Sequence, residues 1–458
     1  MAYAYKKKYN LNGSIRMDQS NLFGSNISQQ YKPIWSVGSS WLISNEPFFK
    51  KNLVNSLKLR LTYGIAGNSP NPGSGGPYDI IQPQPGFFYQ NVGLGYSILL
   101  PSNKKLTWES TSTLNAGVDV GILENRVTFS VDVYSKMTDN LLGYSPFDPT
   151  NGWSSGYTNL GNIENKGVEL AVVSQNIVSR NFSWTTRLNF AYNHNKVVKL
   201  GQVIPLTANG KLSSQGFVEG YSAYSLFDLQ WAGLDNQGNP QVYSSKGQKI
   251  KMSSDLSLDD VHYAGSTQPA YYGGMTNTFR YKALELSCLI IYNLGYQMRS
   301  YTNNYFSGRL TNNISTYFND RWKNPGDENK TNVPKYISST DVDAASRSIE
   351  LYEDANINME SASYIKMRDI TLTYSLPISW ISRLSMDNAQ VYTQVNNLML
   401  WTANHQGIDP EYYNAQAGPG SVNGASGAGG GQLLGAPTSA LPDKMKPFWT
   451  FGLRVSFN

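Results

Sequence analysis

The sequence is poor in cysteine, histidine and charge. It has one cysteine, Cys288, and three histidines among 458 residues. One cysteine excludes an internal disulfide, and His194, His262 and His405 lack the i, i+4 spacing of a metal site. Charged residues make up 15% and the net charge is +5, with Lys and Arg scattered rather than gathered in a stripe. We therefore expect no metal or other cofactor, no catalytic residues, no enzymatic activity and no binding to nucleic acid.

Long apolar runs are also missing. No segment approaches the roughly 18 to 20 uninterrupted apolar residues of a transmembrane helix, and the mean hydropathy of −0.39 is too polar for a helical membrane protein. Aromatic residues are abundant at 13%, and 41 Gly and 21 Pro supply turns and loops throughout. The apolar groups are dispersed, as in a β-barrel, where about ten alternating residues span the membrane.

Alternation of apolar and polar residues marks the strands. In the last residues of the chain, Trp449, Phe451, Leu453, Val455 and Phe457 share one face and polar residues share the other. The same pattern recurs upstream and predicts 12 strands, or 13 if Ala2–Tyr5 is the end of another. The clearest further examples are Leu57–Ile65, Thr113–Ile122, Val127–Tyr134, Val168–Val172, Trp184–Asn193, Leu286–Tyr292 and Ile370–Tyr374.

The connections between these strands alternate between short and long. Short ones fall at 45–52, 123–126, 176–182, 280–283 and 377–388, and long ones at 69–106, 199–268, 299–360 and 402–446. Short periplasmic turns and long external loops are the asymmetry of an outer-membrane barrel. The polar faces carry charges that lipid does not tolerate, which predicts a hydrated or plugged lumen; these are Lys58, Arg60, Asp119, Asp132, Lys136 and Arg187.

Several long strings resemble one family of transporters. LKLRLTYGIAGN (57–68), NLGNIENKGVEL (159–170), RWKNPGDENKTNVPKY (321–336), ESASYIKMRDITLTYSLP (360–377) and VYTQVNNLMLWTANHQGIDPEYY (391–413) resemble the SusC/RagA family of TonB-dependent transporters of Bacteroidota. KYNLNGSIRMDQSNLFG (8–24), PIWSVGSSWLISNEPFF (33–49) and WAGLDNQGNPQVY (231–243) do so as well. The resemblance runs end to end but matches only the C-terminal half of the family.

The resemblance implies an all-β, antiparallel transmembrane barrel of 22 strands, of which this chain holds about 12 to 13. We expect residues 1–458 to be one domain, an incomplete barrel without the plug. The implied function is TonB-dependent import of glycan or peptide oligomers. The expected partners are a missing N-terminal barrel and plug segment or chain, a SusD-like surface lipoprotein over the mouth, TonB through the plug, and outer-membrane lipid. The C-terminus is expected in the periplasm.

Two other functions stay open at the level of sequence. A passive porin-like channel would have the same strands and no plug, and a structural anchor of a surface assembly would import nothing. Candidate ligand contacts are loop aromatics, whose faces stack on sugar rings, although such residues more often pack the loop or form an interfacial girdle. They are Trp153, Tyr157, Tyr301, Tyr305, Trp322, Tyr412 and Tyr413.

Overall fold

The computed structural model describes most of the chain. The described residues are 1–20, 31–69, 76–89, 93–146, 150, 153, 155–201, 207–212, 217–300, 316–337, 347–382, 386–405, 407–413 and 447–457. Among them, no helix is long and apolar enough to cross a membrane.

Within the described residues, thirteen antiparallel strands form the main sheet, which confirms the number predicted from alternation, with Ala2–Tyr5 as the additional strand. Their hydrogen-bonded order is β1-β2-β3-β4-β7-β8-β11-β12-β18-β19-β22-β23-β24. The strands are β1 (Ala2–Tyr5), β2 (Tyr9–Gln19), β3 (Tyr31–Leu42), β4 (Val54–Asn68), β7 (Glu109–Ile122), β8 (Val127–Asp139), β11 (Gly161–Val178), β12 (Phe182–Leu200), β18 (Tyr271–Tyr281), β19 (Leu284–Leu294), β22 (Tyr364–Ser375), β23 (Met386–Thr402) and β24 (Phe448–Phe457).

The strands are longer than the apolar pattern that predicts them. The clear alternation of Trp184–Asn193 covers only part of β12, which continues through Lys196 and Lys199 to Leu200. Backbone pairing does not require an apolar residue, so a strand extends where its side chains become polar. The sequence pattern marks the part of each strand with apolar side chains and underestimates the full length of the strand.

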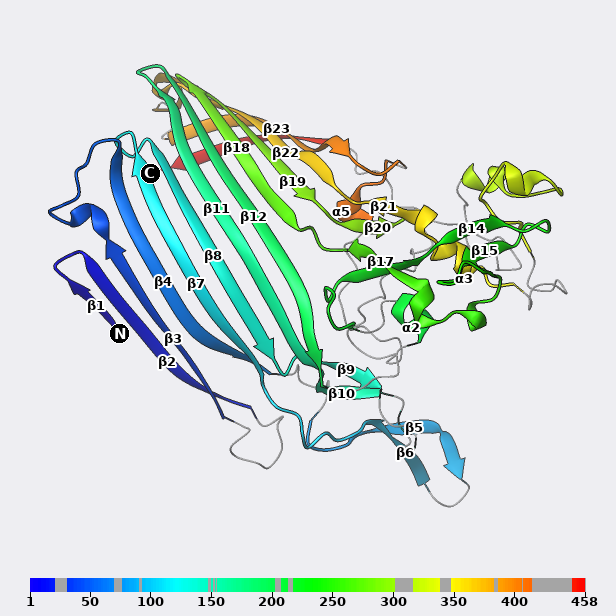
Figure 1. Ribbon diagram of the computed structural model, residues 1–458. Helices are drawn as coiled ribbons and strands as arrows, with labels where there is room; N and C mark the ends of the chain where they lie inside the picture. The colour runs from blue at the N-terminus through cyan, green and yellow to red at the C-terminus, as the bar shows by residue number, and fades with distance from the viewer. Residues whose placement is uncertain are drawn as a thin grey trace. The chain divides into compact units, whose positions relative to one another are not determined.

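The chain divides into two compact units. The first comprises residues 1–175, 189–204 and 219–223, and the second comprises residues 176–188, 205–218 and 224–458. Neighbouring strands of the first unit, such as β4, β7 and β8, lie side by side as long antiparallel ribbons (Figure 1). Neither unit contradicts the expectation of a single domain, which stays a prediction.

Short and long connections alternate in both units as predicted. In the first unit, residues 6–8, 43–53 and 123–126 join strands at one end of the sheet. In the second, residues 282–283 join β18 to β19, and residues 376–385 join β22 to β23.

The connections contain small sheets and helices of their own, most of them in the longer ones. In the first unit these are β5 (Ile80–Tyr89), β6 (Gly93–Leu100), β9 (Leu142–Pro146), β10 (Ser155–Asn159) and η2 (Ile43–Asn45). In the second they are α2 (Ala208–Leu212), β13 (Ser225–Leu229), β14 (Trp231–Leu234), β15 (Pro240–Tyr243), β16 (Lys249–Ile250), η4 (Ser253–Asp255), η5 (Leu258–Asp260), β17 (Val261–Ser266), β20 (Gln297–Arg299), η6 (Thr316–Asp320), η7 (Asp327–Asn329), α3 (Glu350–Glu353), η9 (Asn356–Asn358), β21 (Met359–Ser361), α4 (Ile378–Ile381) and α5 (Pro410–Tyr413).

Glycines on the polar face let side chains lie across neighbouring strands. Tyr134 of β8 lies over Gly167 of β11, and its hydroxyl donates to Asn193 Oδ1 of β12 at 3.0 Å. In the second unit, the ring of Tyr392 in β23 lies over Gly452 of β24, where an added Cβ would be 2.3 Å from the Tyr392 ring. A strand glycine thus accommodates the close approach of a neighbour, and it fixes which residues face each other.

Candidate functional site

The polar face of the first unit carries an ion cluster centred on Arg60 of β4. Its guanidinium donates to Asp119 of β7 through Nε at 3.0 Å and Nη2 at 2.9 Å. It also donates to Asp132 of β8 through Nη1 at 2.9 Å and Nη2 at 2.7 Å. Ser130 Oγ donates to Asp119 at 2.7 Å and Asn115 Nδ2 donates to Asp132 at 2.9 Å. The planar guanidinium therefore pairs with two carboxylates at once, a geometry that lysine does not offer.

Gly117 makes room for this cluster. It lies on β7 between Arg60 and Asp132, which face it from the two adjacent strands. A Cβ at this position would be 2.5 Å from Asp132 Oδ1 and 2.7 Å from Arg60 Cζ. The cluster links three strands only because the middle one has no side chain there.

The opposite face of the same strands is apolar and exposed. Leu59 and Leu61 flank Arg60 in β4, and they point away from the charges because successive residues alternate between faces. In the second unit, Trp449, Phe451 and Leu453 show the same exposure, with Phe451 at 77%. Wide apolar exposure on one face and paired charges on the other suit a wall between lipid and a polar interior.

The long connections of the second unit fold around a small core of their own. Its buried members come from α2, β13, β15, β16, β17 and α3: Ala208, Leu212, Phe227, Leu229, Val242, Ile250, Val261 and Leu351. Arg299 beside this core donates through Nη2 to the carbonyl oxygens of Leu212 and Phe227, both at 2.8 Å, and forms an ion pair with Asp354. These connections are organised structures, held by apolar packing and by charge-assisted hydrogen bonds.

A buried ion cluster anchors the segment that follows β23. Lys366 of β22 is 0% exposed, and its Nζ donates to Asp409 Oδ2 at 2.7 Å and to Glu411 Oε2 at 2.8 Å. Arg368 donates through both terminal nitrogens to Glu411. Burial opposes ionisation of Glu411, but the hydrogen bonds from Lys366 and Arg368 outweigh it and hold the pKa of Glu411 below its usual value.

This buried cluster was not predicted. The segments 360–377 and 391–413 both resemble the family, but nothing in either segment indicates that their charged residues form ion pairs with each other. A signal exists in hindsight, because Lys366 and Arg368 are two basic residues at i and i+2 on one face of a strand. The carboxylates lie more than forty positions downstream, so pattern alone does not reveal the pairing.

The structure locates three of the seven predicted ligand contacts. Trp153 is half-buried. Tyr157 in β10 packs beside Leu106 and Trp108. Trp322 is only 7% exposed, and its Nε1 donates to Glu328 at 3.0 Å, so its ring shapes its own loop. Trp153 and Tyr157 belong to the first unit and Trp322 to the second, and the role of all three as ligand contacts stays a prediction. Tyr301 and Tyr305 lie outside the described residues, as do the side chains of Tyr412 and Tyr413.

Comparison with known proteins identifies related chains. Residues 2–398 match the family described as "TonB dependent receptor-like, beta-barrel". TonB-dependent receptor P39 of Formosa agariphila is 30% identical over 462 residues, which cover 90% of this chain and 43% of that protein. TonB-dependent receptor SusC of Bacteroides thetaiotaomicron is 27% identical and covers 89% of this chain and 40% of that protein. The chain thus spans less than half the length of these relatives.

Solved structures agree with the sequence relatives. The RagAB peptide importer in its "open-open" state has a TM-score of 0.72 and 25% identity, covering 100% of this chain and 46% of that one. The RagAB peptide transporter gives a TM-score of 0.71 and 26% identity over 90% of this chain and 44% of that one.

Proposed function

Because the chain belongs to the TonB-dependent receptor-like β-barrel family, we propose that it forms the C-terminal part of a SusC/RagA-type importer. Its cargo is an oligomer, either peptide or glycan, carried across the outer membrane. The plug and the remaining strands of a 22-stranded barrel lie on polypeptide outside these 458 residues. A SusD-like surface lipoprotein covers the mouth, and TonB acts through the plug.

The Arg60 cluster is the observation that carries this proposal. Moving a charged side chain into the hydrocarbon of a membrane costs several kcal/mol, so Arg60, Asp119 and Asp132 are unfavourable on a face that contacts lipid. On the polar face of a two-faced strand the same charges line a hydrated interior. The RagAB peptide transporter and TonB-dependent receptor SusC are both similar to this chain over about nine tenths of its length. Their similarity supports a conduit for oligomers rather than an enzyme.

In the proposed orientation, the short turns and the C-terminus face the periplasm and the long connections face outward. The organised core of the second unit's connections supports this arrangement, because a surface that meets a lid needs a fixed shape. The loop aromatics remain the proposed ligand contacts.

Transport and energy coupling are tested together. A strain lacking this chain is expected to lose uptake of either a fluorescent oligopeptide series or a fluorescent oligosaccharide series, and deletion of tonB should cause the same loss. Uptake that survives tonB deletion would indicate a passive channel. Unchanged uptake of both series with loss of a surface assembly would indicate a structural anchor.

Orientation is tested separately by cysteine labelling. In a Cys288→Ser background, Lys330→Cys places a thiol on a long connection and Lys282→Cys places one in a short turn of the same unit. A membrane-impermeant maleimide added to intact cells should label the first variant and not the second. Labelling of Lys282→Cys alone would reverse the proposed orientation.

A further inference from the structure

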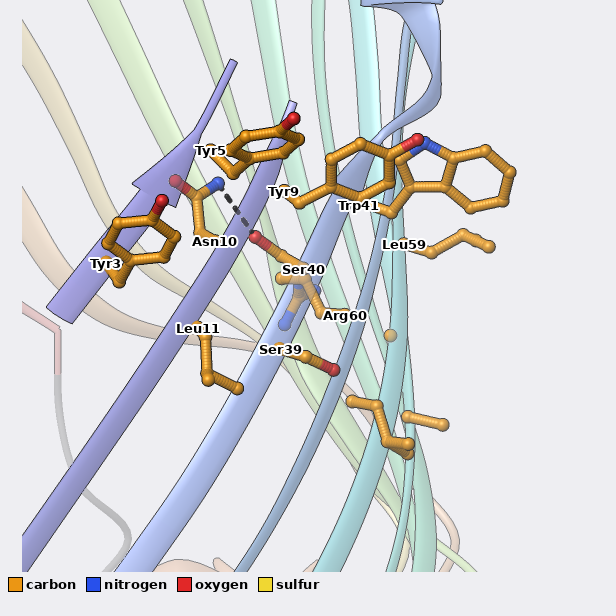
Figure 2. A pocket seen from close by; sticks show the side chains of 13 residues that line it. Tyr3, Tyr5, Tyr9, Asn10, Leu11, Ser39, Ser40, Trp41, Leu59 and Arg60 are labelled. Carbon is orange, nitrogen blue, oxygen red and sulfur yellow. Dashed lines mark hydrogen bonds between the residues drawn. The ribbon is translucent and has the colours of Figure 1, made fainter. Parts of the chain in front are cut away.

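The apolar face of the first unit is hollowed by a groove near its β1 edge. The groove has a volume of about 640 Å³, and its lining includes Tyr3, Leu11, Ser39, Trp41, Leu59 and Leu61. Figure 2 shows Tyr3, Leu11, Ser39 and Leu59 on β1, β2, β3 and β4, with the rings of Tyr9 and Trp41 beside Leu59.

The groove exists because a small residue interrupts a row of large ones. Ser39 of β3 faces Leu11 of β2 on one side and Leu61 of β4 on the other. Ala116 of β7 continues the row beyond Leu61. Tyr3 faces Leu11 from β1 and raises the wall on that side. The depression over Ser39 thus lies between large apolar side chains, which suits an apolar ligand.

At one end of the groove, near the turns 6–8 and 43–53, aromatic side chains form hydrogen bonds through their polar atoms. The rings of Tyr9 and Trp41 stack with centroids 6.1 Å apart. The Tyr9 hydroxyl donates to Glu46 at 2.6 Å, Trp41 Nε1 donates to it at 3.0 Å, and Lys8 Nζ donates to it at 2.9 Å. The hydrogen bond from Tyr9, with those from Lys8 and Trp41, lowers the pKa of Glu46 to about 2. Aromatic rings with hydrogen-bonded tips mark the depth where hydrocarbon meets head groups.

The same two turns carry an excess of positive charge. Lys8 neutralises Glu46, whereas Lys6, Lys7, Lys50 and Lys51 are exposed, and in the described part of the chain none of these four forms an ion pair. Asn45 Nδ2 donates to the carbonyl oxygen of Lys7 at 3.1 Å, which ties the two turns together. Phe48, two residues before Lys50, is 67% exposed. Lysines beside an exposed phenylalanine suit the surface of an anionic membrane.

We propose that this groove binds an anionic phospholipid. One acyl chain lies over Ser39 between Leu11 and Leu61, and the phosphate lies among Lys6, Lys7, Lys50 and Lys51. The inference goes beyond import and needs only the outer-membrane placement of the strands. A second copy of the chain is a poorer occupant, because a two-fold contact on this patch would bring the same lysines face to face.

Lipid titration with native mass spectrometry tests the site on the purified protein with its copurifying chains. Phosphatidylglycerol and phosphatidylethanolamine with identical acyl chains are compared. The charge variant is Lys6→Gln/Lys7→Gln/Lys50→Gln/Lys51→Gln, and its matched control is Lys104→Gln/Lys105→Gln, two exposed lysines of the same unit that precede β7. Heat-modifiable migration in a detergent gel confirms that each variant is folded.

The charge variant is expected to bind phosphatidylglycerol about 10-fold more weakly or worse, while the control stays within about twofold of the parent. Filling the groove with Ser39→Phe should weaken both lipids, whereas Val37→Phe, on the same face of β3, should weaken neither. Equal binding of both lipids by the parent protein would overturn the proposal, and so would unchanged binding by the charge variant. A dimer that Ser39→Phe abolishes, without loss of lipid, would assign the groove to a second copy instead.

Discussion

Replacing Lys366 by methionine should release the segment that follows β23. The ammonium group is 0% exposed and makes the charged hydrogen bonds to Asp409 and Glu411 at 2.7 and 2.8 Å. Removing one partner of a buried ion pair costs about 3 to 5 kcal/mol because a buried charge is left behind. Glu411 keeps Arg368 and is 30% exposed, so the lower end of that range, about 3 kcal/mol, applies.

Hydrogen exchange measures this effect where it acts. A loss of about 3 kcal/mol in local stability raises amide exchange in residues 407–413 by roughly 100-fold, provided that exchange proceeds through local opening. Lys330→Met is the matched control, since Lys330 is exposed and its 3.2 Å pair with Asp327 is a surface ion pair, which contributes little to stability. The double variant Lys366→Met/Asp409→Asn should recover part of the loss. Exchange within about threefold of the parent protein in Lys366→Met would refute the buried pair as the anchor.

Three further predictions follow from described contacts. Gly117→Val pushes a side chain into the Arg60 cluster and should destabilise the protein by about 1 to 3 kcal/mol in denaturant gels, whereas Gly13→Ala, with its nearest atom at 3.7 Å, should not. Because the pKa of Glu411 is lowered on folding, its contribution to stability is present above the unfolded pKa and is lost as pH falls through the folded pKa. The protection of amides in 407–413, relative to their intrinsic exchange rate at each pH, should therefore fall on acidification, and Glu411→Gln should weaken that dependence. Trp322→Phe removes the hydrogen bond to Glu328 and should loosen this loop, seen as hydrogen exchange of the amides around residue 322 that is about fivefold faster.

The strands were predictable because a two-faced sheet imposes a period of two. Trp449 to Phe457 and Leu57 to Ile65 alternate without interruption, and lipid on one side with a polar interior on the other demands that pattern. The ends of strands were less predictable, since β12 runs on through polar residues that pair by backbone alone. Charges on the polar face were also predicted, including Arg60, Asp119 and Asp132.

The pairing of those charges was not predictable. Arg60 reaches Asp132 over Gly117, and the sequence contains no signal that this glycine lies between them. The long connections pose the same difficulty, because their cores join residues far apart along the chain, such as Leu212 and Leu351. The loop aromatics could be named from the sequence but their packing could not: Trp322 is only 7% exposed and donates to Glu328, and its contact with ligand stays a prediction.

The side chains that lie across glycines also bear on mechanical strength. Tyr134 lies over Gly167 and Arg60 lies over Gly117, each on a neighbouring strand. If one strand slid past the next, each of these side chains would collide with the residue beside the glycine. A force directed along the strands is therefore resisted by these side-chain contacts as well as by the backbone hydrogen bonds. In the proposed importer, these contacts would stiffen the barrel wall against sliding of its strands.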